Sequence, residues 1–249
     1  MIALLSDYGA SDYAGVTKGV IYSVCKKCQM VDLTHSISPQ NILQAAWVLK
    51  TNYKFFPRKT IFVCLVQPGS LKADEPLIVK TKNYTFVGPN NGIMHDAVME
   101  DGLVQAEQVV LGEKWKIAGT FQGRDLFARV AGLLEAGKKV KVKKFKQPLQ
   151  QASLYLKGNI GVIANIDTFG NIITNIPAGW QKQRYKVNYD GMEALLDFHP
   201  HYSQGREGEL FVIKGSSDTY EFSVKDASAL ERFETILAKP VIGKKIAIE

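Results

Sequence analysis

The stretch TIFVCLVQPG, residues 60–69, decides how the chain around it folds. Its first part, TIFVCL, is an apolar, β-branched run typical of a buried strand, and the Pro-Gly pair ends that strand. A strand that ends in this way turns its next residues outward at its carboxyl end, where open α/β sheets bind ligands. Gln67 lies there, and its amide neither gives up nor takes a proton near neutral pH. The stretch predicts the mouth of a site, and leaves open whether that site keeps its chemistry.

Predicted strands and helices alternate on both sides of this stretch. Further strands are expected at 2–5, 30–33, 76–80 and 84–88. Helical spacing is present at 11–24, 40–54, 93–99 and 124–137, and Gly137 is placed to end the last helix. In the first helix, Tyr13, Val16, Val20 and Val24 share an apolar face. Alternating β and α elements with short connections predict an α/β domain with a mainly parallel central sheet.

The texture of the sequence changes after Lys146. Short apolar runs are separated by Gly, Asp and Asn, and the pattern lacks long helices: NIGVIANID (159–167), GELFVIKG (208–215), TYEFSV (219–224) and KKIAIE (244–249). Such runs predict a small antiparallel sheet or barrel. We therefore expect an N-terminal α/β domain over residues 1–150 and a smaller C-terminal antiparallel β-barrel domain over 151–249.

The composition is that of a globular chain with a local excess of positive charge. The 249 residues are 46% hydrophobic and 22% charged, with a net charge of +7. The run KKVKVKKFK, residues 138–146, supplies much of that excess and is open to two interpretations. It is either a nucleic-acid patch or an exposed strand whose Val140, Val142 and Phe145 pack beneath. Because no Tyr or Trp is interleaved for base stacking, packing is favoured, and no nucleic-acid partner is expected.

The cysteines and the N-terminal sequence indicate the cellular compartment in which the protein is expected. Cys25 and Cys28 form CKKC, and Cys64 lies in the apolar strand run. No second CxxC or HxxxH completes a zinc site, so structural cysteines in a reducing compartment are favoured, with a redox pair as the alternative. The N-terminus MIALLSDYG lacks the basic region of a signal peptide, and no run approaches about 18 apolar residues. We expect a cytoplasmic protein with no membrane partner and no metal.

Two polar motifs carry candidate binding residues. In SDYG, residues 6–9, Asp7 follows the first strand, where a carboxylate can accept both hydroxyls of a ribose or can cap the next helix. Asp12 is a first-turn residue of that helix. In IDTFGN, residues 166–171, Phe169 can stack on a base and Asn171 can bond to its edge. The alternative is a turn held by Asx hydrogen bonds of its own.

The chain resembles the S-adenosylmethionine (SAM) hydroxide adenosyltransferases and their relatives, the adenosyl chlorinases and fluorinases. Seven blocks occur in the order of that family: SDYG (6–9), KGVIYSV (18–24), VDLTHSISPQNI (31–42), FFPRKTIFVCLVQPG (55–69), FVGPNNGI (86–93), TFQGRDLFARVAGLL (120–134) and IDTFGNIITNI (166–176). The resemblance implies the two domains described above and a homotrimer. Each site would lie between one subunit's N-domain and a neighbour's C-domain. It also implies displacement at the ribose C5′ of SAM, which is a substrate, with no cofactor.

The resemblance implies roles for the binding residues. Asp7 matches the carboxylate that binds the ribose of the adenosyl group, and Asp12 and Asp167 match acids near the methionine ammonium. Phe169 and Asn171 match the segment beside the adenine. Ser70 resembles a halogenase-type position and is the remaining substrate-binding candidate.

Other positions depart from the family pattern. Gln40 stands where an aromatic residue usually follows the proline of the HxIxP segment. Ser216 and Ser217 align loosely with the arginine that would hold the methionine carboxylate.

The catalytic positions depart furthest. Hydrolytic members place and activate water with Asp, Arg and His, and the matching residues here are Gln67, Asp74 and Gln122. Halogenases carry tyrosine where Gln67 is. The glutamines can orient water but cannot take its proton, whereas Asp74 can act as a base if its loop folds inward. We expect a SAM-cleaving enzyme with an altered water site; the alternative is a nucleoside-binding protein that keeps the pocket without the chemistry.

Overall fold

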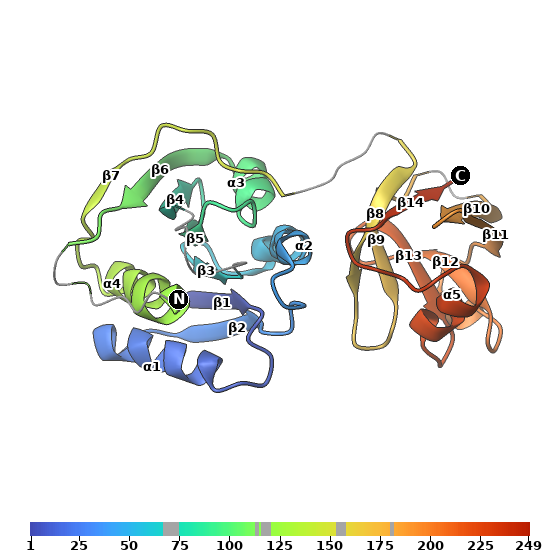
Figure 1. Ribbon diagram of the computed structural model, residues 1–249, viewed down its shortest axis with the longest axis horizontal. Helices are drawn as coiled ribbons and strands as arrows, with labels where there is room; N and C mark the ends of the chain where they lie inside the picture. Colours follow the sequence, from blue (N-terminus) through green and yellow to red (C-terminus); the bar gives the residue numbers. More distant parts are fainter. Residues whose placement is uncertain (67–74, 113–114, 116–120, 153–157, 180–181) are drawn as a thin grey trace. The chain divides into compact units, whose positions relative to one another are not determined.

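The computed structural model describes residues 1–66, 75–112, 115, 121–152, 158–179 and 182–249. The chain divides into two compact units, Met1–Ser153 and Leu154–Glu249 (Figure 1). Each unit is built on one seven-stranded sheet.

The sheet of the first unit is mixed, with its parallel strands at one side. The strand order is β2 (Met30–Thr34), β1 (Ile2–Ser6), β3 (Ile61–Leu65), β5 (Thr85–Pro89), β4 (Pro76–Thr81), β6 (Leu103–Val109) and β7 (Val142–Lys144). The pairings β1–β2, β1–β3 and β3–β5 are parallel. The pairings β4–β5, β4–β6 and β6–β7 are antiparallel. The predicted α/β architecture is confirmed, and its parallel part is the four strands that precede the candidate residues.

Helices cover both faces of this sheet (Figure 1). They are α1 (Tyr13–Val24), α2 (Ile42–Asn52), η1 (Tyr53–Phe55), α3 (His95–Asp101), η2 (Gly123–Ala128) and α4 (Arg129–Glu135). Successive residues of β1 point to opposite faces, so Ala3 and Leu5 join the core with α2 and α3. Ile2 and Leu4 join the core with α1, η2 and α4. The strands β1, β3 and β5 are therefore buried on both faces, whereas the edge strand β2 is partly exposed.

Two local expectations differ in outcome. Gly137, with a φ of 67°, follows the end of α4 at Glu135, which confirms the predicted stop. The predicted apolar face of α1 is buried only in part, because Tyr13 and Val16 are 51% and 42% exposed, whereas Val20 packs against the core. The buried positions of α1 are Thr17 and Ile21.

The basic run packs as the strand interpretation expects. Phe145 is buried, and Val140 and Val142 pack against the core beneath α1 and α4. The lysines around them are exposed. In the part of the chain that the structure describes, no helix is long and apolar enough to cross a membrane.

The second unit is a nearly closed antiparallel barrel. Its strand order is β11 (Met192–Asp197), β10 (Arg184–Tyr189), β14 (Lys245–Ile248), β8 (Ile160–Ile166), β9 (Ile172–Pro177), β13 (Thr219–Val224) and β12 (Leu210–Lys214). A bridge between Phe198 and Val212 brings the two edges of the sheet together. The helix α5 (Ala229–Ile236) buries Phe233 against Tyr189 and Phe222. The segment η3 (Tyr202–Gln204) is a single 3-10 turn. The predicted barrel is confirmed.

Tyr53 makes the stability of the first unit sensitive to alkaline pH. Its side chain is 4% exposed and packs edge-on against Tyr84 and Phe86. Burial disfavours the phenolate and, with the negative charges of Glu100 and Asp101, raises the pKa of Tyr53 to about 12. A group whose pKa is raised on folding stabilises the fold fully below its unfolded pKa, about 10 for tyrosine. That contribution is lost as pH rises toward 12.

We expect the Tyr53→Phe variant to lose stability less steeply between pH 10 and 12 than the wild type. One proton corresponds to at most about 1.4 kcal/mol per pH unit. Urea unfolding across this range measures the slope for both proteins. Parallel slopes would contradict the assignment of the proton to Tyr53.

Candidate functional site

The candidate site begins at the carboxyl edge of the parallel strands. Because β1, β2, β3 and β5 run in the same direction, the residues that follow them meet at one edge of the sheet. Asp7 follows β1, His35 follows β2 and Asn90 follows β5. The side chain of Asn91 donates a 2.9 Å hydrogen bond to the carbonyl of Val66, which ties the turn after β5 to the end of β3. The edge predicted from TIFVCLVQPG is therefore formed.

Asp7 is held from the opposite loop and does not cap a helix. Its Oδ2 accepts a 2.8 Å hydrogen bond from the backbone N–H of Gln40, a residue with a φ of 61°. Asp12 is the residue that precedes α1, and its exposed side chain makes no capping bond. The capping interpretation of Asp7 is therefore wrong. Oδ2 thereby fixes the side chain, and Asp7 makes no second side-chain hydrogen bond to the residues that the structure describes.

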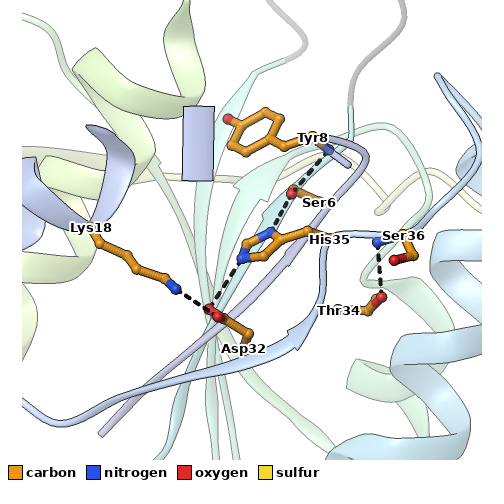
Figure 2. A network of polar contacts seen from close by, with 7 residues as sticks. All are labelled: Ser6, Tyr8, Lys18, Asp32, Thr34, His35 and Ser36. Carbon is orange, nitrogen blue, oxygen red and sulfur yellow. Dashed lines mark hydrogen bonds and ion pairs between the residues drawn. The ribbon is translucent and has the colours of Figure 1, made fainter. Parts of the chain in front are cut away.

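Beneath Asp7 lies a chain of polar contacts that the sequence did not reveal (Figure 2). Ser6 Oγ lies 2.6 Å from His35 Nδ1, and His35 Nε2 lies 3.1 Å from Asp32 Oδ1. Lys18 Nζ of α1 lies 2.6 Å from Asp32 Oδ2. Burial of Asp32 favours its neutral form, but the contacts of its carboxylate with Lys18 and His35 outweigh this effect and lower the pKa of Asp32. The carboxylate is therefore ionised at neutral pH.

An aromatic group surrounds Tyr8 beside Asp7. The Tyr8 ring stacks on His35, with ring centroids 6.2 Å apart and an interplanar angle of 9°. It also meets the rings of Tyr13 and Phe121 edge-on, each at 5.8 Å. Burial raises the pKa of Tyr8 to about 12, and the negative charge of Asp7 adds to this effect. Tyr8 is therefore a neutral phenol at physiological pH and cannot serve as a base.

Gln122 is the one predicted catalytic residue that the structure describes, and it belongs to the same edge. It precedes η2, a π-helical turn, which is a distortion often found at functional sites. The next residue, Gly123, lies so close to Tyr8 that a Cβ there would overlap the Tyr8 hydroxyl and would contact Leu65 at the end of β3. The structure therefore brings Gln122 to the strand ends that carry Asp7.

The second unit carries the other predicted binding residues on one turn between β8 and β9. Asp167 Oδ1 accepts hydrogen bonds from the backbone N–H groups of Phe169 and Asn171, at 2.9 and 2.8 Å. Its Oδ2 accepts one from the Asn171 side chain at 2.9 Å. The Asx-turn interpretation is confirmed for Asp167 and Asn171. The turn holds Phe169 outward, 78% exposed, as a ring available for stacking.

A further carboxyl group lies near this turn and was missed from the sequence. Glu221 of β13 accepts a 3.1 Å hydrogen bond from the Ser223 hydroxyl. Burial raises the pKa of Glu221, and the charge of Asp167 raises it further, while the Ser223 hydrogen bond opposes both. Gly215 has no side chain and so leaves room for the Glu221 carboxylate. A Cβ at position 215 would lie 2.5 Å from Glu221 Oε2.

Both units match domains of one family. The SAM hydroxide adenosyltransferase N-terminal domain matches residues 2–144, and the C-terminal domain of the same family matches residues 161–242. The chain belongs to the SAM hydroxide adenosyltransferase family. The seven blocks named above all lie within these two matched ranges.

Relatives and solved structures agree with this membership. The chain is 30% identical over 191 residues to an (R)-S-adenosyl-L-methionine hydrolase of Methanocaldococcus jannaschii, covering 71% of this chain and 66% of that protein, just under two-thirds of its length. It is 30% identical to the hydrolase of the same name from Thermus thermophilus, covering 70% and 74%. It is 27% identical to a fluorinase of Actinopolyspora mzabensis, covering 71% of each. A crystal structure of an uncharacterized conserved protein from Thermotoga maritima matches with a TM-score of 0.83 and 27% identity, over 100% of both chains.

Three of the predicted site residues of this SAM hydroxide adenosyltransferase family member, Gln67, Ser70 and Asp74, lie outside the described residues. Those that are described fall into two groups. Asp7, Asp12 and Gln122 belong to the first unit, and Asp167, Phe169 and Asn171 belong to the second.

The close approach of Gly123 to Tyr8 gives a direct test of the edge geometry. We expect Gly123→Ala to push the Tyr8 ring out of place and to lower the free energy of unfolding by about 1–3 kcal/mol, the usual cost of overpacking. Urea denaturation measures the change. Gly19→Ala is the matched control, because a Cβ at that helical position meets nothing within 4 Å and should be neutral or stabilising. If Tyr8→Phe does not restore stability to Gly123→Ala, the clash is not the cause.

Proposed function

We propose that this chain cleaves SAM with water to give adenosine and L-methionine. The water oxygen forms a bond to the ribose C5′ as the C5′–S bond breaks. The electron pair of the C5′–S bond stays on the methionine sulfur, and the attacking water loses one proton to the solvent. Support comes from the family domains across both units and from relatives named (R)-S-adenosyl-L-methionine hydrolase. The observation that carries the proposal is the placement of Asp7 at the strand edge. Its Oδ2 accepts from the Gln40 N–H, and its Oδ1 would accept from the substrate.

The nucleoside half of the substrate would be bound from two directions. Asp7 would accept both ribose hydroxyls, which are charge-assisted hydrogen bonds and stronger than neutral ones. The exposed ring of Phe169 would stack on the adenine. Asp12 and Asp167 would place negative charge near the methionine ammonium. The hydrogen bonds that Asp167 accepts within its own turn keep that charge in one place.

The site would position the attacking water molecule but would lack a general base to take its proton. Gln67 and Gln122 can orient a water molecule, but an amide cannot remove its proton, and a general base typically contributes 10²–10⁴-fold. Tyr8 is protonated at neutral pH, and His35 is engaged with Ser6 and Asp32. The sulfonium is a good leaving group, so positioning supplies part of the rate. We therefore propose slow hydrolysis. The neutral groups around Asp7 also favour the second candidate, a nucleoside-binding protein that keeps the pocket without turnover.

Because the family resemblance places half of each site on a neighbouring chain, a monomer would lack a complete pocket. We expect a homotrimer in solution at micromolar concentration. Light scattering gives the mass directly, and a monomeric mass would remove the basis for a shared site.

Ribose binding is tested with adenosine alone. Asp7→Ala should raise the dissociation constant of adenosine at least about tenfold, because charge-assisted hydrogen bonds to hydroxyls are worth about 1.5–3 kcal/mol. Calorimetry measures the constant. Asp12→Ala is the matched control, since its exposed carboxylate is assigned to the methionine end, and it should bind adenosine as the wild type does. Equal affinities for Asp7→Ala and the wild type would refute the ribose assignment.

The altered water site is tested by restoring the hydrolytic residues. Turnover of SAM, followed by chromatography of adenosine and methionine, should be slow for the wild type. The triple variant Gln67→Asp, Asp74→Arg and Gln122→His should be faster, while each single change does little, because catalytic groups act as a unit.

A wild type as fast as hydrolases that carry the complete set would contradict the altered-site proposal. A folded triple variant without turnover would support the binding-protein candidate in its place.

A further inference from the structure

We infer that His35 is a positioning residue for the ribose-binding carboxylate, acting through Ser6 on the backbone that carries Asp7. The inference rests on the proposed function, since it assumes that Asp7 binds the ribose. Its basis is the contact between His35 Nδ1 and Ser6 Oγ at 2.6 Å and the hydrogen bond that the Tyr8 N–H donates to Ser6 Oγ at 3.3 Å (Figure 2). Asp7 is the residue between Ser6 and Tyr8.

Ser6, His35 and Asp32 have the residue types of a nucleophilic triad but not its accessibility. A nucleophilic serine must reach its substrate, and Ser6 has no exposed surface. Its hydroxyl is enclosed between the imidazole of His35 and the backbone of Tyr8. The contacts of this group therefore serve to hold structure in place.

The charges around His35 select one proton arrangement. The Asp32 carboxylate, paired with Lys18, faces Nε2 at 3.1 Å, an ion-pair distance without the alignment of a good hydrogen bond. A negative charge there favours the tautomer with its proton on Nε2. Nδ1 then accepts from the Ser6 hydroxyl, and the Ser6 oxygen accepts from the Tyr8 N–H. Lys18 then donates to Asp32, the Ser6 hydroxyl to His35 Nδ1 and the Tyr8 N–H to Ser6 Oγ, while the Nε2 proton of His35 faces the Asp32 carboxylate at ion-pair distance.

The same histidine joins the two loops that flank Asp7. The carbonyl of His35 accepts a 2.8 Å hydrogen bond from the Gly9 N–H, and the Ile37 N–H reaches the carbonyl of Ser6 at 3.4 Å. The Gln40 N–H, further along the loop after His35, is the donor that fixes Asp7 Oδ2. Asp7 therefore takes its place from contacts with the loop after β2. Losing the imidazole would leave the buried Ser6 hydroxyl without an acceptor and would loosen the turn that aims the carboxylate.

A double-mutant cycle on adenosine affinity tests this inference. His35→Phe keeps a ring against Tyr8 but offers Ser6 no acceptor, and it should raise the dissociation constant of adenosine about tenfold. In the Asp7→Ala background the same change should have little effect, because the carboxylate that His35 positions is already gone. His35→Asn, whose side-chain oxygen can accept from Ser6, should bind adenosine within about threefold of the wild type.

The outcomes separate this inference from the proposed function. Equal losses from His35→Phe with and without Asp7 would mean a general structural role, and would overturn the inference alone. A wild type without affinity for adenosine would overturn both proposals. If His35→Phe does not fold, Ser6→Ala replaces it in the cycle, since it removes only the hydroxyl that links His35 to Tyr8. Additive losses of adenosine affinity from Ser6→Ala and Asp7→Ala would also overturn the inference.

Discussion

The parallel pairing of β1 with β2 is the constraint on which the candidate site depends. The register that sets Leu5 beside Thr34 also sets the ends of the two strands side by side. Ser6 and His35, 29 residues apart in sequence, are thereby brought within hydrogen-bonding distance. Since the backbone on either side of Asp7 is bonded to the loop after β2, a shift of this register would separate the carboxylate from its supports. The placement of Asp7 is thus specified by strand pairing.

The chemistry at this edge is that of recognition more than of proton transfer. Asp32 is ionised but committed to Lys18 and His35, and Tyr8 is neutral because its surroundings are dry. Asp7 is held by the Gln40 N–H, and under the proposed function a sulfonium nucleoside would offer its ribose hydroxyls to this carboxylate. In the second unit, Asp167 accepts hydrogen bonds from its own turn, and the turn holds Phe169 exposed. Under the proposed function, each unit supplies binding groups, and the chemical step would fall to Gln67, Asp74 and Gln122.

Sequence patterns were sufficient for features that depend on local chemistry. The strand before Gln67, the stop at Gly137, the antiparallel second unit and the Asx turn at Asp167 all follow from short runs of residues. Features that depend on register or close packing could not be predicted. Neither Ser6 nor Asp32 indicates that His35 will lie between them, and the need for glycine at 123 depends on the Tyr8 hydroxyl. Apolar spacing alone also does not show which residues of α1 are buried, since Tyr13 and Val16 are exposed and Thr17 is buried.

The central claim is that the Asp7 carboxylate binds ribose hydroxyls, and comparison of two ligands on the unaltered protein tests it most directly. Calorimetry with adenosine and with 2′,3′-dideoxyadenosine changes only the two hydroxyl groups and leaves the base and the protein untouched. The account requires that dideoxyadenosine bind at least about tenfold more weakly, because its ribose offers the carboxylate no donor and leaves a charged acceptor unpaired. Equal affinities for the two nucleosides would contradict it.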